Sequence, residues 1–300
     1  MKKFLLGIFA LFFVACSQTS SVISLNPYLS KADQTVSGKS VNINAINDQR
    51  ENQMVIAVIN DNDGKLVDEV LLKNNLSAWF DKALRAELDL IGAGGVPQTA
   101  LMRRLYEEAV LPFGLDLQPF YDLLSAFAQD VVKTRYQNFA ELADYCRRSA
   151  NPVGRILLQL YGETDTRSLA RSDGICTALQ LINFWQDVAV DWRKGRVYIP
   201  QDDLAKFGVT EAQIAEGRAD FAFQRLMAYQ CGRAFKMLKA GAPLGRTLKG
   251  RIGFELRMIV VGGQIILQKL DGCRYNVFEQ RPVLGKKDWW LIVKRAFLKK

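Results

Sequence analysis

The pattern of the sequence changes near residue 86, and this change limits the folds open to the chain. From there to the C-terminus, apolar residues recur at helical spacing in long stretches joined by short segments with glycine and proline. Asn151-Pro152 opens one such stretch, and Gly162 closes it. A capping box at Thr210–Gln213 precedes another stretch, which ends at Gly241. We therefore expect residues 86–300 to form an all-α domain.

The first 16 residues have the layout of a secretory signal peptide. Two lysines precede an apolar run from Phe4 to Phe13, which is too short to span a bilayer, and a polar stretch follows Cys16. A cysteine at the cleavage point resembles a bacterial lipoprotein signal, in which Cys16 would be lipidated. The alternative is a buried N-terminal helix, which the lysines and the abrupt polar shift after Cys16 disfavour.

Residues 17–85 are rich in serine, asparagine, aspartate and threonine, and they predict a small α+β segment. The apolar run Met54–Ile59 predicts a strand, and the polar run Asn60–Gly64 predicts a turn after it. Leu76–Leu90 has helical spacing instead. From the signal to Arg50 the sequence resembles the front half of a small periplasmic lipoprotein family typified by YajG. We therefore expect a lipoprotein-like fragment in front of the helical domain.

The composition excludes several kinds of chemistry. The chain has no histidine, which excludes histidine-ligated zinc and both Ser-His-Asp and Cys-His catalysis. Its five cysteines form no CxxC pair, so we expect those after Cys16 to be reduced and mostly buried. The net charge of +9 favours an anionic partner, which could be nucleic acid, acidic lipid or a phosphorylated metabolite. No recognisable motif interleaves basic and aromatic residues, so we expect no nucleic-acid partner.

Residues 168–192 predict a long buried helix with one narrow polar stripe. The stripe consists of four residues spaced by three, four and four positions: Gln180, Asn183, Asp187 and Asp191. The residues around it are apolar: Leu179, Leu181, Ile182, Phe184, Trp185, Val188, Ala189 and Val190. A helix that is apolar on nearly all sides is buried. The stripe is therefore expected to face an interior cavity.

The two aspartates of this stripe indicate a divalent cation. Carboxylates four residues apart on a helix repel each other by roughly a few tenths of a kcal/mol, and burial increases the repulsion. Mg²⁺ takes oxygen ligands and bridges to phosphate oxygens, so it would relieve this repulsion. The alternative is that Asp187 and Asp191 are a chance surface pair. The apolar surroundings and the amides of Gln180 and Asn183 favour a metal–diphosphate site.

Cationic and phenolic side chains follow the second aspartate, where the helix should end: Arg193, Lys194, Arg196 and Tyr198. Guanidinium groups and a phenol are suited to binding phosphate oxygens. For Arg193 and Lys194 the alternative is that they neutralise the C-terminus of the helix. This segment therefore supports an anion site next to the aspartates.

Three segments resemble the squalene/phytoene synthase family. Leu179–Pro200 looks like the second aspartate-rich signature of that family. Gln129-Asp130 with Arg135-Tyr136, and the run Tyr145–Gly154, resemble the helices that line the same cavity. The resemblance covers roughly residues 86–300.

Two shorter runs are closest to the hopanoid-pathway branch of the family, the hydroxysqualene synthases. They are Ser149–Gly154 and Arg281–Lys286. The resemblance implies an all-helical prenyl-diphosphate synthase fold. It also implies a reaction in which Mg²⁺ withdraws diphosphate from presqualene or farnesyl diphosphate, while an apolar tunnel holds the carbocation. Hydroxysqualene synthases convert presqualene diphosphate and water to hydroxysqualene.

The resemblance assigns roles to eight residues. The metal ligands are Asp187 and Asp191. The phosphate contacts are Arg135, Arg196 and Tyr198. The catalytic residues are Tyr145, which would face the reacting carbons, and Gln180 and Asn183, which would line the diphosphate site.

The sequence departs from the family at its first aspartate-rich motif. Family members carry this motif on an early helix, and no such pair occurs between residues 86 and 179. Asp61 and Asp63 lie in the lipoprotein-like turn instead. We therefore expect the synthase domain to be N-terminally incomplete, fused to part of another protein and low in turnover.

The C-terminal segment 286–300 predicts an amphipathic helix. Its apolar residues follow helical spacing: Trp289, Ile292, Val293, Ala296 and Phe297. With six cations around them, they predict a helix in the membrane interface, and packing on the core is the alternative. We expect a peripheral enzyme on the cytoplasmic face of the inner membrane, although the N-terminal signal favours export. The alternative function is an exported lipoprotein with a binding or structural role.

Overall fold

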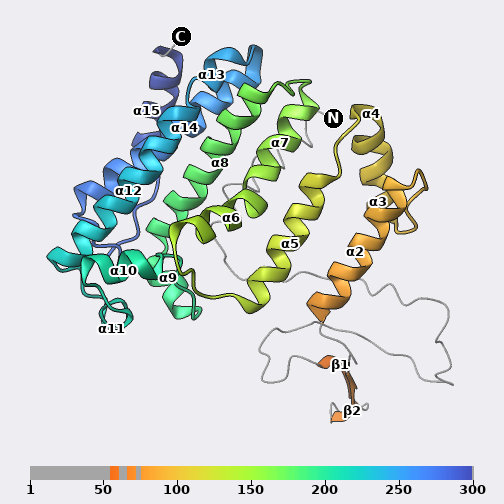
Figure 1. Cartoon of the computed structure of the whole chain (residues 1–300), viewed down its shortest axis with the longest axis horizontal. Helices are drawn as coiled ribbons and strands as arrows, with labels where there is room; N and C mark the ends of the chain where they lie inside the picture. Colours follow the sequence, from red (N-terminus) through yellow and green to blue (C-terminus); the bar gives the residue numbers. More distant parts are fainter. Residues whose placement is uncertain (1–54, 61–65, 72–75, 299–300) are drawn as a thin grey trace. The chain divides into compact units, whose positions relative to one another are not determined.

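A computed structural model describes residues 55–60, 66–71 and 76–298 (Figure 1). The chain forms two compact units, Met1–Lys82 and Ala83–Lys300. The signal segment with Cys16 lies outside the described residues, as do Asp61 and Asp63.

The first unit contains a β-hairpin. Strand β1 (Val55–Asn60) pairs antiparallel with β2 (Leu66–Leu71), and Val58 lies opposite Glu69. The predicted strand is confirmed at residues 55–59, and the predicted turn Asn60–Gly64 lies, apart from Asn60, outside the described residues. Helix α2 (Leu76–Gly92) begins in this unit and continues into the second, as its helical spacing predicted.

The second unit is built from helices, which confirms the all-α prediction. After α2 its elements are α3 (Ala100–Leu105), the π-helix η2 (Tyr106–Val110), α4 (Leu111–Phe113), α5 (Gln118–Val132), α6 (Phe139–Ser149), α7 (Asn151–Leu160), α8 (Thr166–Gln186), α9 (Val188–Arg193), α10 (Gln201–Phe207), α11 (Glu211–Ala215), α12 (Phe221–Gly241), α13 (Leu244–Thr247), α14 (Gly250–Gly272) and α15 (Lys286–Leu298). The long helices α5, α7, α8 and α12 follow one another across Figure 1. Among the described residues, no helix is both long enough and apolar enough to cross a membrane.

The predicted helix ends are confirmed for α7 and for the C-terminal end of α12 at Gly241, and the predicted start of α12 is wrong. Helix α7 has a proline in its first turn, and Gly162 after its end takes a left-handed conformation with φ 74°. Thr210 caps a helix of only five residues, because the chain turns at Gly217. Asp220 then caps α12 by accepting a hydrogen bond from the Phe223 N–H (3.1 Å).

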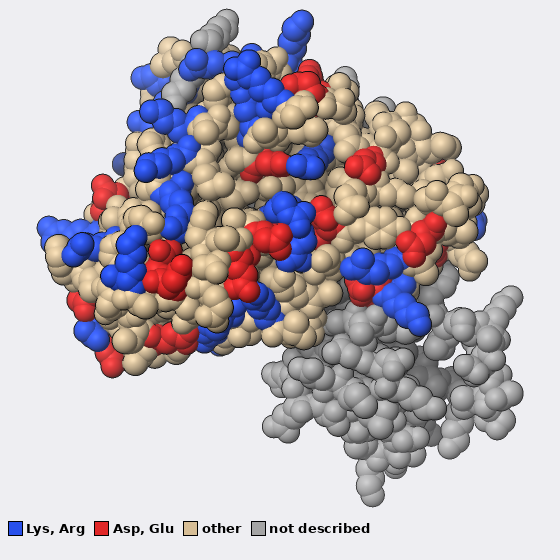
Figure 2. Space-filling model, viewed as in Figure 1, with Lys and Arg blue, Asp and Glu red and all other residues tan. Residues whose placement is uncertain are grey.

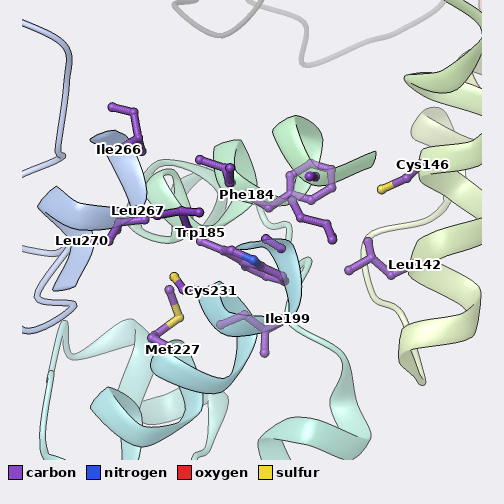
Figure 3. Close-up of a cluster of buried hydrophobic side chains, with 14 of the residues drawn as sticks. Leu142, Cys146, Phe184, Trp185, Ile199, Met227, Cys231, Ile266, Leu267 and Leu270 are labelled. Atoms are coloured by element: carbon purple, nitrogen blue, oxygen red, sulfur yellow. The ribbon is translucent and has the colours of Figure 1, made fainter. Parts of the chain in front are cut away.

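Helix α8 is the central element of the core. It packs against α6, α7, α12 and α14, and eleven of its residues are buried. Trp185 is fully buried, and Figure 3 shows its ring among side chains from α12 and α14 together with Ile199. Because α8 is enclosed on most sides, the prediction of a buried helix is confirmed.

Two glycines let the neighbouring helices approach α8 closely. A Cβ on Gly154 of α7 would lie 2.6 Å from Cys176 Sγ, and one on Gly241 of α12 would lie 2.5 Å from the Arg171 carbonyl oxygen. Neither position has room for a larger residue. The four cysteines after Cys16 are free thiols, and all except Cys273 are buried, as expected.

Candidate active site

The polar stripe lies on two helices and not on one. Helix α8 ends at Gln186, where Asp187 leaves helical geometry (φ −102°, ψ 12°), and α9 begins at Val188. The prediction of one continuous helix over residues 168–192 is therefore wrong. The Asp191 N–H still donates to the Asp187 carbonyl oxygen (2.7 Å), so the two aspartates remain one turn apart. Gln180 and Asn183 are half-buried on α8.

Asp187 forms an ion pair that the spacing did not reveal. The Arg281 guanidinium donates from two nitrogens to the two carboxylate oxygens of Asp187, and its Nη2 lies 3.2 Å from Oδ2. Next to this pair, Gln186 Nε2 donates to the Pro282 carbonyl oxygen (2.7 Å). The segment after α14 therefore lies across the break between α8 and α9, and Arg281 neutralises the buried Asp187.

Asp191 has a different environment. Burial, followed by the neighbouring charge of Asp187, raises the pKa of its carboxyl to about 6, while Lys194 and Arg196 act in the opposite direction. Asp191 lines a cavity of about 10 Å³ with Phe184, Val188, Arg196, Val197, Tyr198 and Ile199. The structure thus brings together Asp191, Arg196 and Tyr198. This cavity has room for about one water, and Gln180 and Asn183 do not line it.

Aromatic rings form one wall of this site. Tyr198 stacks on Phe184 with ring centroids 3.8 Å apart and planes at 7°. Tyr145 and Tyr136 lie beside this pair, with centroids 6.2 and 5.7 Å from that of Tyr198. Both are almost completely buried. Four aromatic residues therefore form one cluster of packed rings next to Asp191.

Asp130, at the end of α5, connects the aromatic residues to the guanidinium group of Arg196. Its carboxylate accepts a hydrogen bond from Tyr145, and burial raises its pKa, although Tyr145 and Arg196 oppose this. Its Oδ1 is buried without a hydrogen bond and lies 3.9 Å from Arg196 Nη1. Arg196 also donates to the Asp130 carbonyl oxygen (2.8 Å) and to the Tyr198 hydroxyl (3.2 Å). The phenol, the acid and the guanidinium therefore form one connected network.

Arg135 forms its hydrogen bonds with other parts of the protein and not with the residues that line the cavity. Its guanidinium donates to both carboxylate oxygens of Glu211 (2.6 and 2.9 Å) and to the carbonyl oxygens of Thr134 and Gly195. All three of its nitrogens therefore have protein acceptors. In this arrangement Arg135 fixes the loop after α9, which presents Arg196 and Tyr198 to the cavity.

The sequence model of the squalene/phytoene synthase family matches residues 53–288. The chain belongs to this family.

Relatives from two branches of the squalene/phytoene synthases match the chain. A hydroxysqualene synthase from Rhodopseudomonas palustris is 34% identical over 69% of this chain and 69% of its own length. A hydroxysqualene synthase from Sinorhizobium fredii is also 34% identical, over 58% of this chain and 59% of that protein. A phytoene synthase from Arthrospira platensis is 32% identical over 56% of this chain and 59% of that protein. The match thus includes both hydroxysqualene and phytoene synthases.

Solved structures show the same helical fold. The crystal structure of squalene synthase HpnC from Alicyclobacillus acidocaldarius superposes with a TM-score of 0.64 and 32% identity, covering 69% of this chain and 77% of that one. A dehydrosqualene synthase superposes with a TM-score of 0.62 and 22% identity, covering 73% of this chain and 78% of that one. The isoprenoid synthase helical fold predicted for this chain is therefore confirmed.

The extent of the family match bears on the N-terminal segment. The match begins at residue 53, inside the segment 17–85 that the sequence patterns associated with a lipoprotein, and it includes Asp61 and Asp63. Membership of the synthase family over residues 53–288 does not favour the alternative function of an exported lipoprotein.

Sequence reasoning missed four residues of this candidate site: Asp130, Arg148, Phe184 and Arg281. Arg148 donates to Gln129 Oε1 (2.5 Å), and Gln129 Nε2 donates to the Tyr136 hydroxyl (3.3 Å), which orders the end of α5. Asp130 and Arg281 lie in segments that resemble the family, but the resemblance assigned no role to either residue. Phe184 had been counted only as part of the apolar surround.

The oxygen ligands of the site fit a cation that binds together with an anion. Among the residues that the structure describes, no group of three histidine, cysteine, aspartate or glutamate side chains could hold a metal alone. Mg²⁺ in proteins is commonly bound by one or two carboxylates, with substrate phosphates and water completing its shell. Asp187 and Asp191 provide two carboxylates, and the raised pKa of Asp191 shows a charge that a cation would stabilise.

Proposed function

We propose that this chain is a squalene or hydroxysqualene synthase-type enzyme of hopanoid or squalene biosynthesis. Its substrate would be presqualene or farnesyl diphosphate. The observation that carries the proposal is the cluster that places Asp191 and Arg196, its polar end, next to the stacked rings of Phe184 and Tyr198, its aromatic end. The similarity to hydroxysqualene synthases supports this substrate class.

The polar end would bind the diphosphate. Asp187 and Asp191 would hold Mg²⁺, which when bound supplies positive charge to the leaving group. Arg196 and Tyr198 would donate hydrogen bonds to phosphate oxygens, and Arg281, which already faces Asp187, offers a second guanidinium. On α8, Gln180 and Asn183 would extend this polar lining towards the substrate.

The aromatic end would hold the carbocation. The ring faces of Tyr145, Phe184 and Tyr198 attract a cation through their quadrupoles, and the burial of Tyr145 and Phe184 excludes all but a small amount of water. In the hydroxysqualene reaction, loss of diphosphate from presqualene diphosphate leaves a cation, and water adds to it and releases a proton. The Tyr145–Asp130 pair can accept that proton, because burial raises the pKa of Asp130.

Binding of a prenyl diphosphate tests the metal assignment. Calorimetric titration with a non-hydrolysable prenyl diphosphate should show binding that requires Mg²⁺ and is lost in the Asp187→Asn, Asp191→Asn double variant. The matched control is the Glu107→Gln, Asp202→Asn double variant, which removes two exposed acids elsewhere in the chain and should bind normally. Equal binding to the double variant of Asp187 and Asp191 would refute the proposal.

We also propose that turnover is low. No paired aspartates occur between residues 86 and 179 to face Asp187 and Asp191, so the leaving group would be incompletely neutralised. A product assay with presqualene diphosphate, run beside the Rhodopseudomonas palustris relative, measures this. Hydroxysqualene or squalene formation at a rate comparable to that relative would contradict it.

We also propose a peripheral position on the cytoplasmic face of the inner membrane, with the C-terminal helix α15 in the membrane interface. Ile292 and Ala296 are buried, so two of the five residues of the predicted apolar stripe pack on the core. Trp290, Val293 and Phe297 remain exposed and are flanked by cations. Anionic vesicles should co-sediment the full chain, and a Trp290→Ser, Phe297→Ser variant should bind less. Unchanged sedimentation of that variant would refute the membrane role.

The N-terminal proposals concern residues outside the described part of the chain. We propose that Cys16 is cleaved and lipidated and that residues 17–85 include a YajG-like fusion. This signal favours export, whereas intracellular prenyl diphosphates require the cytoplasmic side. Mass spectrometry of the mature N-terminus tests acylation of Cys16, and sequencing of the transcript across codons 80–95 tests the fusion. An unmodified Met1 terminus would refute the lipidation.

A further inference from the structure

A long open groove lies on the part of the surface formed by α12, α14 and α15. Its volume is about 780 Å³, within the range of small-molecule sites in proteins. It is lined by Ala228, Cys231, Gly232, Phe235, Gln264, Leu267, Gln268, Asp271, Tyr275, Arg295 and Leu298. None of these residues lines the cavity at Asp191. The groove is therefore a second concave site, separate from the proposed active site.

The three helices run alternately in opposite directions, and this gives the groove its length. Gly263 of α14 lies against Leu238 of α12. Arg257 Nε donates to the Ala296 carbonyl oxygen (2.9 Å), which places the end of α15 beside the beginning of α14. At a rise of 1.5 Å per residue, the lining residues of α14 from Gln264 to Asp271 extend over about 10 Å. The groove is thus a trough between α12 and α15.

The middle of the groove is apolar and open. A Cβ built on Gly232 meets no atom within 4 Å, so the space above this part of α12 is empty. Phe235 is 43% exposed and Leu298 is 72% exposed, which is a large exposure for apolar side chains that line one trough. An apolar chain lying there would bury both side chains.

The two ends of the groove carry opposite charges. Lys236 and Lys239 follow Gly232 and Phe235 by four residues each, so they lie one turn further along the same side of α12, towards Arg295. Figure 2 shows lysine and arginine side chains in a band over the part of the surface where Figure 1 places α12. At the other end, Asp271 accepts a hydrogen bond from the Tyr275 hydroxyl (2.9 Å). A negative group would therefore be attracted to the end with Arg295 and repelled at the end with Asp271.

We propose that this groove binds an anionic amphiphile with a single alkyl or prenyl chain. The chain lies over Gly232 and Leu267, and the acidic head group pairs with Arg295 and the two lysines of α12. The site does not depend on the proposed isoprenoid activity, because it shares no residue with the site around Asp191.

A fluorescence titration of the full chain with dansylundecanoic acid tests the proposal, with the uncharged methyl ester of the same probe alongside. A Cβ at Gly232 meets no atom within 4 Å, so the side chain of Gly232→Leu should occupy the trough, and the Kd for the acid should rise at least about tenfold. The matched control, Ala240→Leu, adds the same side chain to the same helix outside the lining residues and should change the Kd less than about twofold.

Substitutions that reverse the charge of one side chain test the position of the head group. Arg295→Glu should weaken binding of the acid about fivefold or more and leave the ester unchanged, whereas Lys286→Glu, at the other end of α15, should affect neither. Unchanged binding to Gly232→Leu, or equal loss of acid and ester in Arg295→Glu, would overturn the proposal. Both substitutions are at partly or fully exposed positions, and circular dichroism confirms folding of each variant.

Two competitors identify the source of the amphiphile. Displacement of the probe by monomeric oleate assigns a free fatty acid-like ligand. Displacement by phosphatidylglycerol vesicles assigns a lipid drawn from a membrane. A probe that neither competitor displaces does not occupy a site for anionic amphiphiles, and this result would also overturn the proposal.

Discussion

Replacement of Asp191 by asparagine is expected to stabilise the protein at alkaline pH. Burial and the nearby charge of Asp187 make the ionised form of Asp191 unfavourable in the folded state. Asparagine keeps the shape of the side chain and removes the charge. The Asp191→Asn variant should therefore be more stable than the wild type wherever Asp191 is ionised.

The magnitude follows from the pKa of Asp191. An ordinary aspartate pKa of 3.8 raised to about 6 corresponds to about 3 kcal/mol of destabilisation when the carboxyl is ionised. Solvent screening of a carboxyl that is not fully buried reduces this to about 1.5 kcal/mol. A raised folded-state pKa means that the folded protein binds the proton more tightly than the unfolded chain does. Wild-type stability therefore falls as pH rises from about 4 to about 6 and is level above that range.

Urea denaturation at pH 4 and pH 8, with a chelator present, measures the effect. Asp191→Asn should raise the free energy of unfolding by about 1.5 kcal/mol at pH 8 and by almost nothing at pH 4. Asp202→Asn, an exposed control on α10, should change stability by less than about 0.5 kcal/mol at either pH. Equal changes for Asp191→Asn at the two pH values, or a loss of stability at pH 8, would refute the reasoning.

Two further substitutions test the packing around α8. Gly241→Ala should lower the free energy of unfolding by about 1–3 kcal/mol in urea denaturation, because its Cβ would lie 2.5 Å from the Arg171 carbonyl oxygen. Gly272→Ala, with no atom near its Cβ, is the control, and equal effects would contradict this prediction. Thr177→Val should cost about 1–3 kcal/mol, because it leaves the buried Asn151 Oδ1 without the hydroxyl that donates to it at 2.8 Å. An unchanged thermal midpoint would show that this hydrogen bond contributes nothing.

The helical pattern predicted the fold well because the core of this protein is helical and its periodicity is local. The ends of helices were harder to predict. The break at Asp187 leaves the polar stripe in register, because the Asp191 N–H still donates to the Asp187 carbonyl oxygen. Spacing in the sequence therefore looks the same with or without the break. The end of α11 was missed for a different reason, since both Thr210 and Asp220 are good caps and only the turn at Gly217 separates their helices.

The site could be predicted only in part, because its closest contacts join distant segments. Arg196 and Tyr198 follow Asp191 closely in sequence, so their meeting at one cavity could be expected. The pairing of Asp187 with Arg281 joins residues 94 positions apart, and no local spacing indicates it. The same holds for the bidentate contact between Arg135 and Glu211, which are 76 positions apart. A motif identifies the residue types in a site, whereas tertiary packing decides which of them are already paired.

The ion pair between Asp187 and Arg281 gives Asp187 and Asp191, the two aspartates of one motif, different physical roles. Asp187 is held by Arg281, so removal of its charge would leave a guanidinium without its carboxylate. Asp191 has no comparable bidentate partner among the contacts that the structure describes, and burial raises its pKa. The same substitution should therefore have opposite effects on stability at pH 8, a loss for Asp187→Asn and a gain for Asp191→Asn. If both residues also bind Mg²⁺ with diphosphate, the gain at Asp191 should come with a loss of ligand binding. An unfavourable charge kept in the folded state at the cost of stability is the expected property of a residue retained for function.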